Sequence, residues 1–255
     1  MLAPALAGLT ARGQTANLAD PEAGLPVIRS WRAADYLGGA EVWAAAQAAD
    51  GVMLFANLDG VLAHDGRDWA FLKIPPQYVR NVAWAAGAEA SPAPGRLFIS
   101  GVDAFGEVRW DAQAQARHRD LLAELPATNR SVGLLRNLVI HRDGVFAAGD
   151  GVVLRWQADS LERRDFPDAG ATRLFAAGDR LFLHGIKTGL SEWTNGNWEL
   201  RRPATTNEPV TLGGWLGGGG ELRLLIRGTG VIEVSADGRN QPWPSADQQI
   251  GRAHV

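Results

Sequence analysis

Histidine, cysteine and serine, the side chains that most often bind metals or act as nucleophiles, form no recognisable site in this sequence. The chain has no cysteine, which excludes thiol catalysis and Cys-ligated zinc. No pair of its five histidines has metal-ligand spacing; they are His64, His118, His141, His184 and His254. The sequence also lacks HExxH, GxSxG and phosphate-loop motifs. We therefore expect neither a metal nor a cofactor.

Carboxylates are the remaining candidates for catalysis. Glycoside hydrolysis needs two of them facing one bond, and a propeller hydrolase can supply them from distant parts of the chain. Asp59, Asp103 and Glu192 are the candidates for this chemistry. Aspartate is much more often a turn-capping residue, so a hydrolase or lyase acting on polysaccharide is kept as an alternative function.

A second group of residues suits ligand binding better than catalysis. Arg29, Tyr36 and Trp43 lie in the lead-in and in the first repeat, where ligand-binding loops could meet. Asn57 and Asp103 lie at turns of the first two repeats. These five are our candidate ligand-binding residues.

The elements that must position these residues repeat with a period of roughly 40 residues. Similar stretches, each with two apolar runs joined by a glycine-containing turn, begin near Gly51, Gly95, Gly144, Asp179 and Glu221. Short strands at this period are typical of β-propeller blades. We therefore predict an all-β fold, an incomplete β-propeller of about five blades, each a four-stranded antiparallel sheet.

The expected blades span residues 41–72, 79–113, 132–165, 172–202 and 209–243. Asp65-Gly66 and Asn195-Gly196 each separate two apolar runs and predict tight hairpins. Trp69 and Trp198 follow these hairpins and are expected to fill the space between blades. Residues 114–127 have helical composition, although an outer strand followed by a helical turn also fits them.

Composition excludes some classes of partner. With 46% apolar and 21% charged residues the chain resembles an ordinary globular protein. Its net charge of −3 gives no basic surface for nucleic acid and no polybasic patch for a membrane. No apolar run is long enough to span a bilayer.

We expect three segments: 1–23, 24–249 and 250–255. The first is interpreted as a lead-in that includes a truncated signal peptide, because it has an apolar stretch without a basic start. The last, IGRAHV, resembles one translated frame of a common sequencing adapter, so we expect the natural reading frame to continue past Gln249. Residues 24–249 would then be part of a larger propeller.

The order of several motifs resembles the ligand-binding sensor propellers of bacterial two-component regulators, of the three-Y-domain or hybrid histidine kinase type. GLPVIRSW at 24–31 and GVMLFANLDGVLAHDGRDW at 51–69 are similar to the opening phrases of that family. GVDAFG at 101–106 is similar to its G-x-x-E-F-G turn, with Ala104 in place of the usual Glu. Similar motifs recur at 121–126 and 189–196, so the resemblance covers about residues 24–245.

This resemblance implies an extracytoplasmic sensor that is not itself an enzyme. Such a propeller would lie in the periplasm, bind a small molecule or glycan fragment, and form a homodimer in the intact protein. Further blades, a β-sandwich module, a membrane helix and an output domain such as a histidine kinase or diguanylate cyclase would follow it. The alternatives left open are the polysaccharide hydrolase or lyase and a scaffold propeller that binds protein partners.

Overall fold

The computed structural model describes residues 29–36, 38–74, 78–86, 95–110, 115–206, 209–234 and 239–243. The chain divides into two compact units, Met1–Trp31 and Arg32–Val255. In the described part of the first unit, the Arg29 guanidinium carbon lies 5.2 Å from the centroid of the Trp31 ring. The expected lead-in at 1–23 and adapter-like tail at 250–255 lie outside the described residues.

The second unit contains five four-stranded antiparallel sheets, which are the blades. Blade one is β1 (Val42–Gln47), β2 (Met53–Asn57), β3 (Gly60–His64) and β4 (Trp69–Leu72); blade two is β5 (Val79–Ala85), β6 (Arg96–Gly101), β7 (Ala104–Trp110) and β8 (Ala116–Asp120). Blade three is β9 (Leu135–His141), β10 (Gly144–Gly149), β11 (Val152–Gln157) and β12 (Ser160–Asp165). Blade four is β13 (Thr172–Ala177), β14 (Arg180–Gly185), β15 (Gly189–Thr194) and β16 (Asn197–Arg202); blade five is β17 (Thr211–Leu216), β18 (Leu222–Ile226), β19 (Gly230–Val234) and β20 (Asn240–Pro242).

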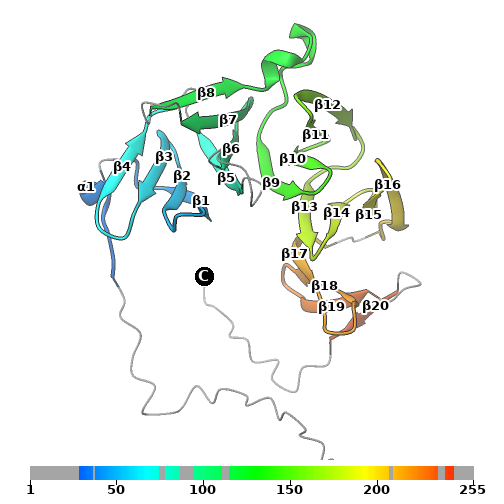
Figure 1. Ribbon diagram of the computed structural model, residues 1–255. Helices are drawn as coiled ribbons and strands as arrows, with labels where there is room; N and C mark the ends of the chain where they lie inside the picture. The colour runs from blue at the N-terminus through cyan, green and yellow to red at the C-terminus, as the bar shows by residue number, and fades with distance from the viewer. Residues whose placement is uncertain are drawn as a thin grey trace, which may run out of the picture. The chain divides into compact units, whose positions relative to one another are not determined.

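Successive blades lie side by side through their first strands. β1 contacts β5, β5 contacts β9, β9 contacts β13, and β13 contacts β17. In Figure 1 these inner strands follow the concave side of an arc of sheets, and the fourth strands lie on its outer side. Strand order within each sheet follows the chain, as expected for a propeller blade. The predicted all-β, incomplete five-blade propeller is confirmed.

Local signals in the sequence predicted one tight hairpin correctly, whereas the connection at Asp65-Gly66 is a four-residue loop, 65–68, between β3 and β4. The loop between β15 and β16 consists of Asn195 and Gly196, with φ of 50° and 81°, as a type I′ turn requires. In the described part of the segment 114–127, from residue 115 on, the alternative prediction is confirmed: the outer strand β8 is followed by two 3-10 turns, Leu122–Glu124 and Ala127–Asn129, and not by an α-helix. No helix in the described part of the chain is long and apolar enough to cross a membrane.

Apolar side chains pack between each pair of blades. One buried cluster, with Leu54 and Leu97, lies between blades one and two, and another, with Phe98 and Leu154, lies between blades two and three. Two further clusters lie between blades three and four and between blades four and five. Blades two, three and four therefore bury both faces between neighbouring sheets, because alternate residues of a strand point to opposite neighbours.

The two predicted inter-blade tryptophans have different surroundings. Trp198 lies in the cluster between blades three and four, 5.2 Å from Trp193 and 6.3 Å from Phe146 between ring centroids, as predicted. Trp69 instead contacts Tyr36 of the short helix α1 (Ala33–Tyr36), at 5.3 Å, and Phe55 at 5.6 Å. Trp69 pairs with His64 on the face of blade one opposite to Ala63, and it also borders a cavity between blades one and two.

Gly189 occupies a position that only glycine fits, and this gives the first prediction. Its φ is +88°, and a Cβ there would lie 2.1 Å from the Arg202 carbonyl oxygen. Gly196 is the matched control, because its φ is +81° but a Cβ would meet nothing within 4 Å. We expect Gly196→Ala to lower the free energy of unfolding by about 1 kcal/mol and Gly189→Ala by several times that amount. Urea denaturation measures both, and equal losses would contradict the steric argument.

Candidate functional site

A cavity of about 400 Å³ lies where the inner strands of the blades meet, and we call it the arginine pocket. The second residue of every inner strand lines it; these are Trp43, Arg80, Arg136, Arg173 and Leu212. A side chain at the same position of each inner strand points the same way, because strand residues alternate between two faces. The repeat thus brings together five positions that are far apart in the sequence.

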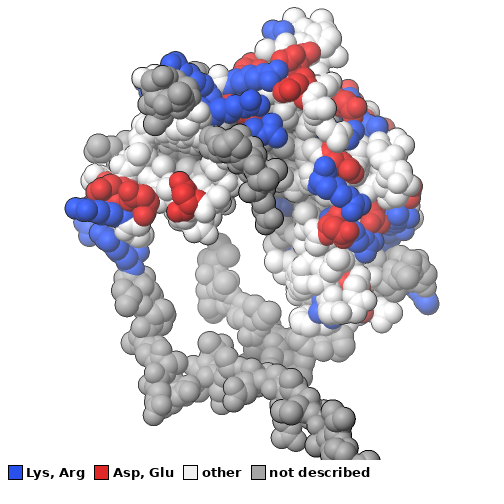
Figure 2. Space-filling view, viewed as in Figure 1, with Lys and Arg blue, Asp and Glu red and all other residues white. Residues whose placement is uncertain are grey.

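The pocket carries more positive than negative charge. Four guanidiniums line it, from Arg80, Arg136, Arg173 and Arg227, but only one carboxylate, from Asp150, among the described residues. The visible surface elsewhere mixes both signs, with basic and acidic side chains interspersed over the outer strands (Figure 2). The excess of cations in the pocket favours an anionic ligand.

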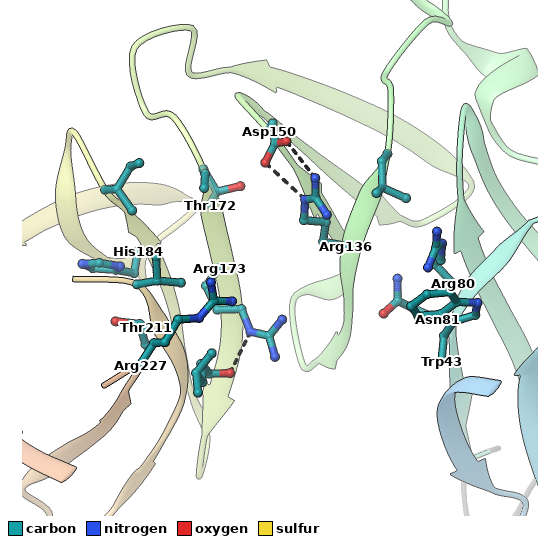
Figure 3. A pocket seen from close by; sticks show the side chains of 15 residues that line it. Trp43, Arg80, Asn81, Arg136, Asp150, Thr172, Arg173, His184, Thr211 and Arg227 are labelled. Carbon is teal, nitrogen blue, oxygen red and sulfur yellow. Dashed lines mark hydrogen bonds and ion pairs between the residues drawn. The ribbon is translucent and has the colours of Figure 1, made fainter. Parts of the chain in front are cut away.

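The single carboxylate neutralises one of the four cations. Arg136 donates from Nη2 to the Asp150 Oδ2 at 3.2 Å and from Nε to Oδ1 at 3.4 Å, as drawn in Figure 3. Their side chains are 48% and 54% exposed, so the pair stabilises the fold by no more than about 1 kcal/mol. A ligand carboxylate could compete for this guanidinium.

Arg80 is held by an aromatic ring instead of an acid. Its guanidinium carbon lies 3.5 Å from the centroid of the Trp43 ring, a close cation–π contact. The buried Nε of Arg80 has no hydrogen-bond acceptor in the described part of the chain. This contact fixes the position of the charge on the wall of the pocket.

Arg173 and Arg227 supply charge from blades four and five. Arg173 donates from Nε to the Leu212 carbonyl oxygen at 2.8 Å, and burial lowers the pKa of its guanidinium. Arginine remains charged at neutral pH despite such a shift. Arg227 is exposed, and within the described residues its side chain has neither an ion pair nor a hydrogen bond. Neither cation is neutralised by a described carboxylate.

Two buried threonines of the pocket differ in how their hydroxyls are satisfied. Thr172 donates from Oγ1 to the Gly149 carbonyl oxygen, which ties blade four to blade three. Thr211 is only 1% exposed, and its Oγ1 has no hydrogen-bond partner among the described residues. A buried hydroxyl without a partner is unfavourable, so it is a candidate for contact with a ligand. His184, also buried, lines the same wall.

Of the predicted ligand-binding residues, the structure places Trp43 in the arginine pocket. Arg29 belongs to the first unit, where it lies against Trp31. Tyr36 is buried in α1 against Trp69. The roles proposed for Arg29 and Tyr36 in ligand binding stay predictions.

The other two candidates are engaged in hydrogen bonds of the fold. Asn57 is fully buried and donates from Nδ2 to the carbonyl oxygens of Gly39, at 2.6 Å, and Glu41, at 2.9 Å. The Asp103 Oδ1 accepts bonds from the backbone N–H groups of Val132 and Gly133, both at 2.7 Å. A ligand would have to displace these bonds, and their roles as ligand residues also stay predictions.

The three carboxylates of the hydrolase alternative do not line the arginine pocket. Asp59 and Asp103 lie in turns of blades one and two, whereas Glu192 lies within β15 of blade four. Glu192 pairs with Arg180 at 2.6 Å and Arg201 at 2.8 Å, and these hydrogen bonds, that of Arg180 first, lower its pKa. No group of three acidic or histidine side chains that could hold a metal occurs among the described residues.

The sequence interpretation missed the pocket arginines. Arg80, Arg136 and Arg173 lie in three different blades, and nothing in their immediate neighbourhood marks them as functional. The signal was their common position, because each directly follows the first residue of an inner strand. Aligning the repeats on those strands would have found all three.

Comparison with known proteins places the fold among β-propellers. Virginiamycin B lyase from Staphylococcus aureus is 10% identical with a TM-score of 0.62, over 86% of this chain and 74% of the lyase. A Xanthomonas campestris gluconolactonase is 18% identical, with a TM-score of 0.51, over 80% and 76%. The extracellular domain of a putative hybrid two-component system from B. thetaiotaomicron is 12% identical, with a TM-score of 0.55, over 75% and 26%. No family model and no curated protein matches the chain.

These neighbours correct one expectation. The chain was expected not to be an enzyme, yet two lyases and a gluconolactonase share its fold as closely as the extracellular domain of the two-component system does. At these identities the likeness establishes the fold alone, and propellers carry many activities. Membership of the fold therefore gives no reason to exclude catalysis.

The two pocket threonines give the second prediction. Thr172→Val removes a bonded hydroxyl and leaves the Gly149 carbonyl without its partner, so the free energy of unfolding should fall by about 1–2 kcal/mol. Thr211→Val removes a hydroxyl without a partner and should leave stability unchanged or raise it by up to about 1 kcal/mol. Urea denaturation distinguishes them. Equal destabilisation by both substitutions would mean that the Thr211 hydroxyl is bonded.

Proposed function

We propose that this chain is a ligand-sensing propeller that recognises an acidic small molecule, such as an acidic sugar fragment, in the arginine pocket. The supporting observation is the combination of guanidiniums without a described acid partner, from Arg80, Arg173 and Arg227, with the unpartnered buried hydroxyl of Thr211. A ligand carboxylate would pair with the guanidiniums and accept a hydrogen bond from the Thr211 hydroxyl, because it is negatively charged and accepts several hydrogen bonds.

The proposed setting is the periplasm, as the extracytoplasmic part of a bacterial signalling protein of the two-component type. The resemblance of the opening motifs supports it, as does the occurrence of an extracellular sensor domain among proteins of this fold. The chain covers 26% of that sensor, so the dimer, membrane anchor and output domain of the intact protein belong to this proposal.

The geometry suggests how binding would be transmitted. Residues from the inner strands of all five blades line the pocket, so one ligand would contact several sheets at once. The binding energy of the ligand would favour the arrangement in which the spacing of the inner strands lets it contact all of them. A dimer with two arrangements would then shift toward the one that the ligand prefers.

Binding of sugar acids gives the third prediction. Glucuronate, galacturonate and gluconate, each compared with its neutral amide, would be titrated calorimetrically into the full chain. We expect at least one acid to bind and its amide to bind at least about tenfold more weakly, since a hydrogen bond to a charged group contributes about 1.5–3 kcal/mol. Arg173→Gln and Arg227→Gln should each weaken binding to a similar extent, and added salt should weaken it as well.

Arg67→Gln is the matched control, because Arg67 is 90% exposed and lies outside the pocket. Acids and amides that bind equally, or Arg67→Gln acting like Arg227→Gln, would contradict the proposal. One-dimensional NMR of the same mixtures over a day reports on turnover. An acid that is bound and converted would make this pocket an enzyme site.

A further inference from the structure

Each blade has an equivalent residue pair, which in blades one to four points toward the next blade. It is the fourth pair counted from the turn between the second and third strands. The five pairs are Leu54–Ala63, Phe98–Glu107, Phe146–Arg155, Phe182–Glu192 and Arg223–Glu233. Four blades carry a charged side chain on the third strand at this position, and blade one carries alanine.

In blades two and four this charge is a glutamate paired with arginine. Glu107 pairs with Arg96 at 3.3 Å, and Glu192 pairs with Arg180 at 2.6 Å. Each arginine also lies over the phenylalanine of the pair, with its guanidinium carbon 5.4 Å from the Phe98 centroid in blade two and 4.9 Å from that of Phe182 in blade four.

In blades three and five an arginine likewise lies near an aromatic ring and pairs with a glutamate. Arg155 lies 5.1 Å from the centroid of Trp193 and pairs with Glu162 at 3.3 Å. Arg223 lies 4.5 Å from that of Trp243 and pairs with Glu233 at 3.3 Å. The recurring arrangement is thus a guanidinium between an aromatic face and a carboxylate.

Blade one lacks this guanidinium and has a cavity in its place. Ala63 stands where blade three has Arg155, and Ala70 pairs with Ala63 as Glu162 pairs with Arg155. A cavity of about 540 Å³ lies here between blades one and two, and we call it the tryptophan cleft. Its volume is in the range of small-molecule sites.

The tryptophan cleft still has the aromatic rings and the carboxylates that surround the guanidinium in the other blades. Trp84 and Trp110, with ring centroids 6.0 Å apart, form its blade-two wall, and no acceptor for the Trp84 indole N–H occurs among the described residues. Asp50, Asp65 and Asp68 also line it, whereas no lysine or arginine does among the described residues. Backbone N–H groups of Asp68 and Arg67 donate to the Asp65 carboxylate and lower its pKa.

We infer that the tryptophan cleft is a second binding site, for a small cation with an apolar body, and that its ligand carries a guanidinium, amidinium or ammonium group. The cation would lie against the indoles of Trp84 and Trp110 and face the carboxylates, as the chain's own arginines do in the other blades. This inference does not depend on the arginine pocket, whose charge is opposite.

Benzamidine and its neutral analogue benzamide test this inference, with the full chain titrated by calorimetry and tryptophan fluorescence. We expect benzamidine to bind saturably at one site and benzamide at least about fivefold more weakly. Ala63→Arg should weaken benzamidine binding at least about tenfold, because the chain's own guanidinium would fill the cleft. Absence of binding, equal binding of the two compounds, or full binding to a folded Ala63→Arg variant would overturn the inference.

A charge variant keeps the test decisive if Ala63→Arg does not fold. Asp50→Asn combined with Asp68→Asn preserves side-chain shape and should weaken benzamidine binding about fivefold. Glu41→Gln, an exposed change in the same blade but outside the cleft, should leave binding unchanged. Arg227→Gln in the arginine pocket should also have no effect. Equal effects of the cleft and control variants would again overturn the inference.

Discussion

Face-to-face packing of successive sheets is the interaction on which the rest of the structure depends. Each interface is a buried apolar cluster, and replacing a fully buried phenylalanine such as Phe98 or Phe146 by alanine typically costs about 3–5 kcal/mol. The surface ion pairs around the blades contribute at most about 1 kcal/mol each. Apolar packing therefore sets the spacing of the inner strands. The arginine pocket follows from that spacing, because its lining residues come from five different sheets.

Sequence reasoning predicted the elements that are encoded locally. Strand runs and two-residue turns such as Asn195-Gly196 depend on neighbours in the chain, so the blades could be placed within a few residues. The candidate site was harder to predict, because its residues meet only after the sheets pack. Trp43 was proposed for its position in the first repeat, whereas Arg136 and Arg173 have no local feature that distinguishes them from surface arginines.

Asn57 and Asp103 show why polar residues at turns are ambiguous in a sequence. A side chain with several acceptors or donors near a turn can serve either a ligand or the backbone. Here the Asn57 amide joins the segment before blade one to the β2–β3 turn, and the Asp103 carboxylate holds the chain entering blade three. Buried backbone groups must be paired, so these side chains satisfy a requirement of the fold whether or not a ligand binds nearby.

A repeat fold generates binding sites by varying a few equivalent positions. The second residue of each inner strand converges on one cavity, where arginine in three blades produces a cationic surface. In blades one to four the fourth pair of the central hairpin points into the space before the next blade; a charged residue occupies that space in blades two, three and four, whereas alanine leaves it open in blade one. Neither variation disturbs the apolar clusters that hold the sheets. The same scaffold can therefore carry sites of opposite charge, which is consistent with the diverse activities of its structural neighbours.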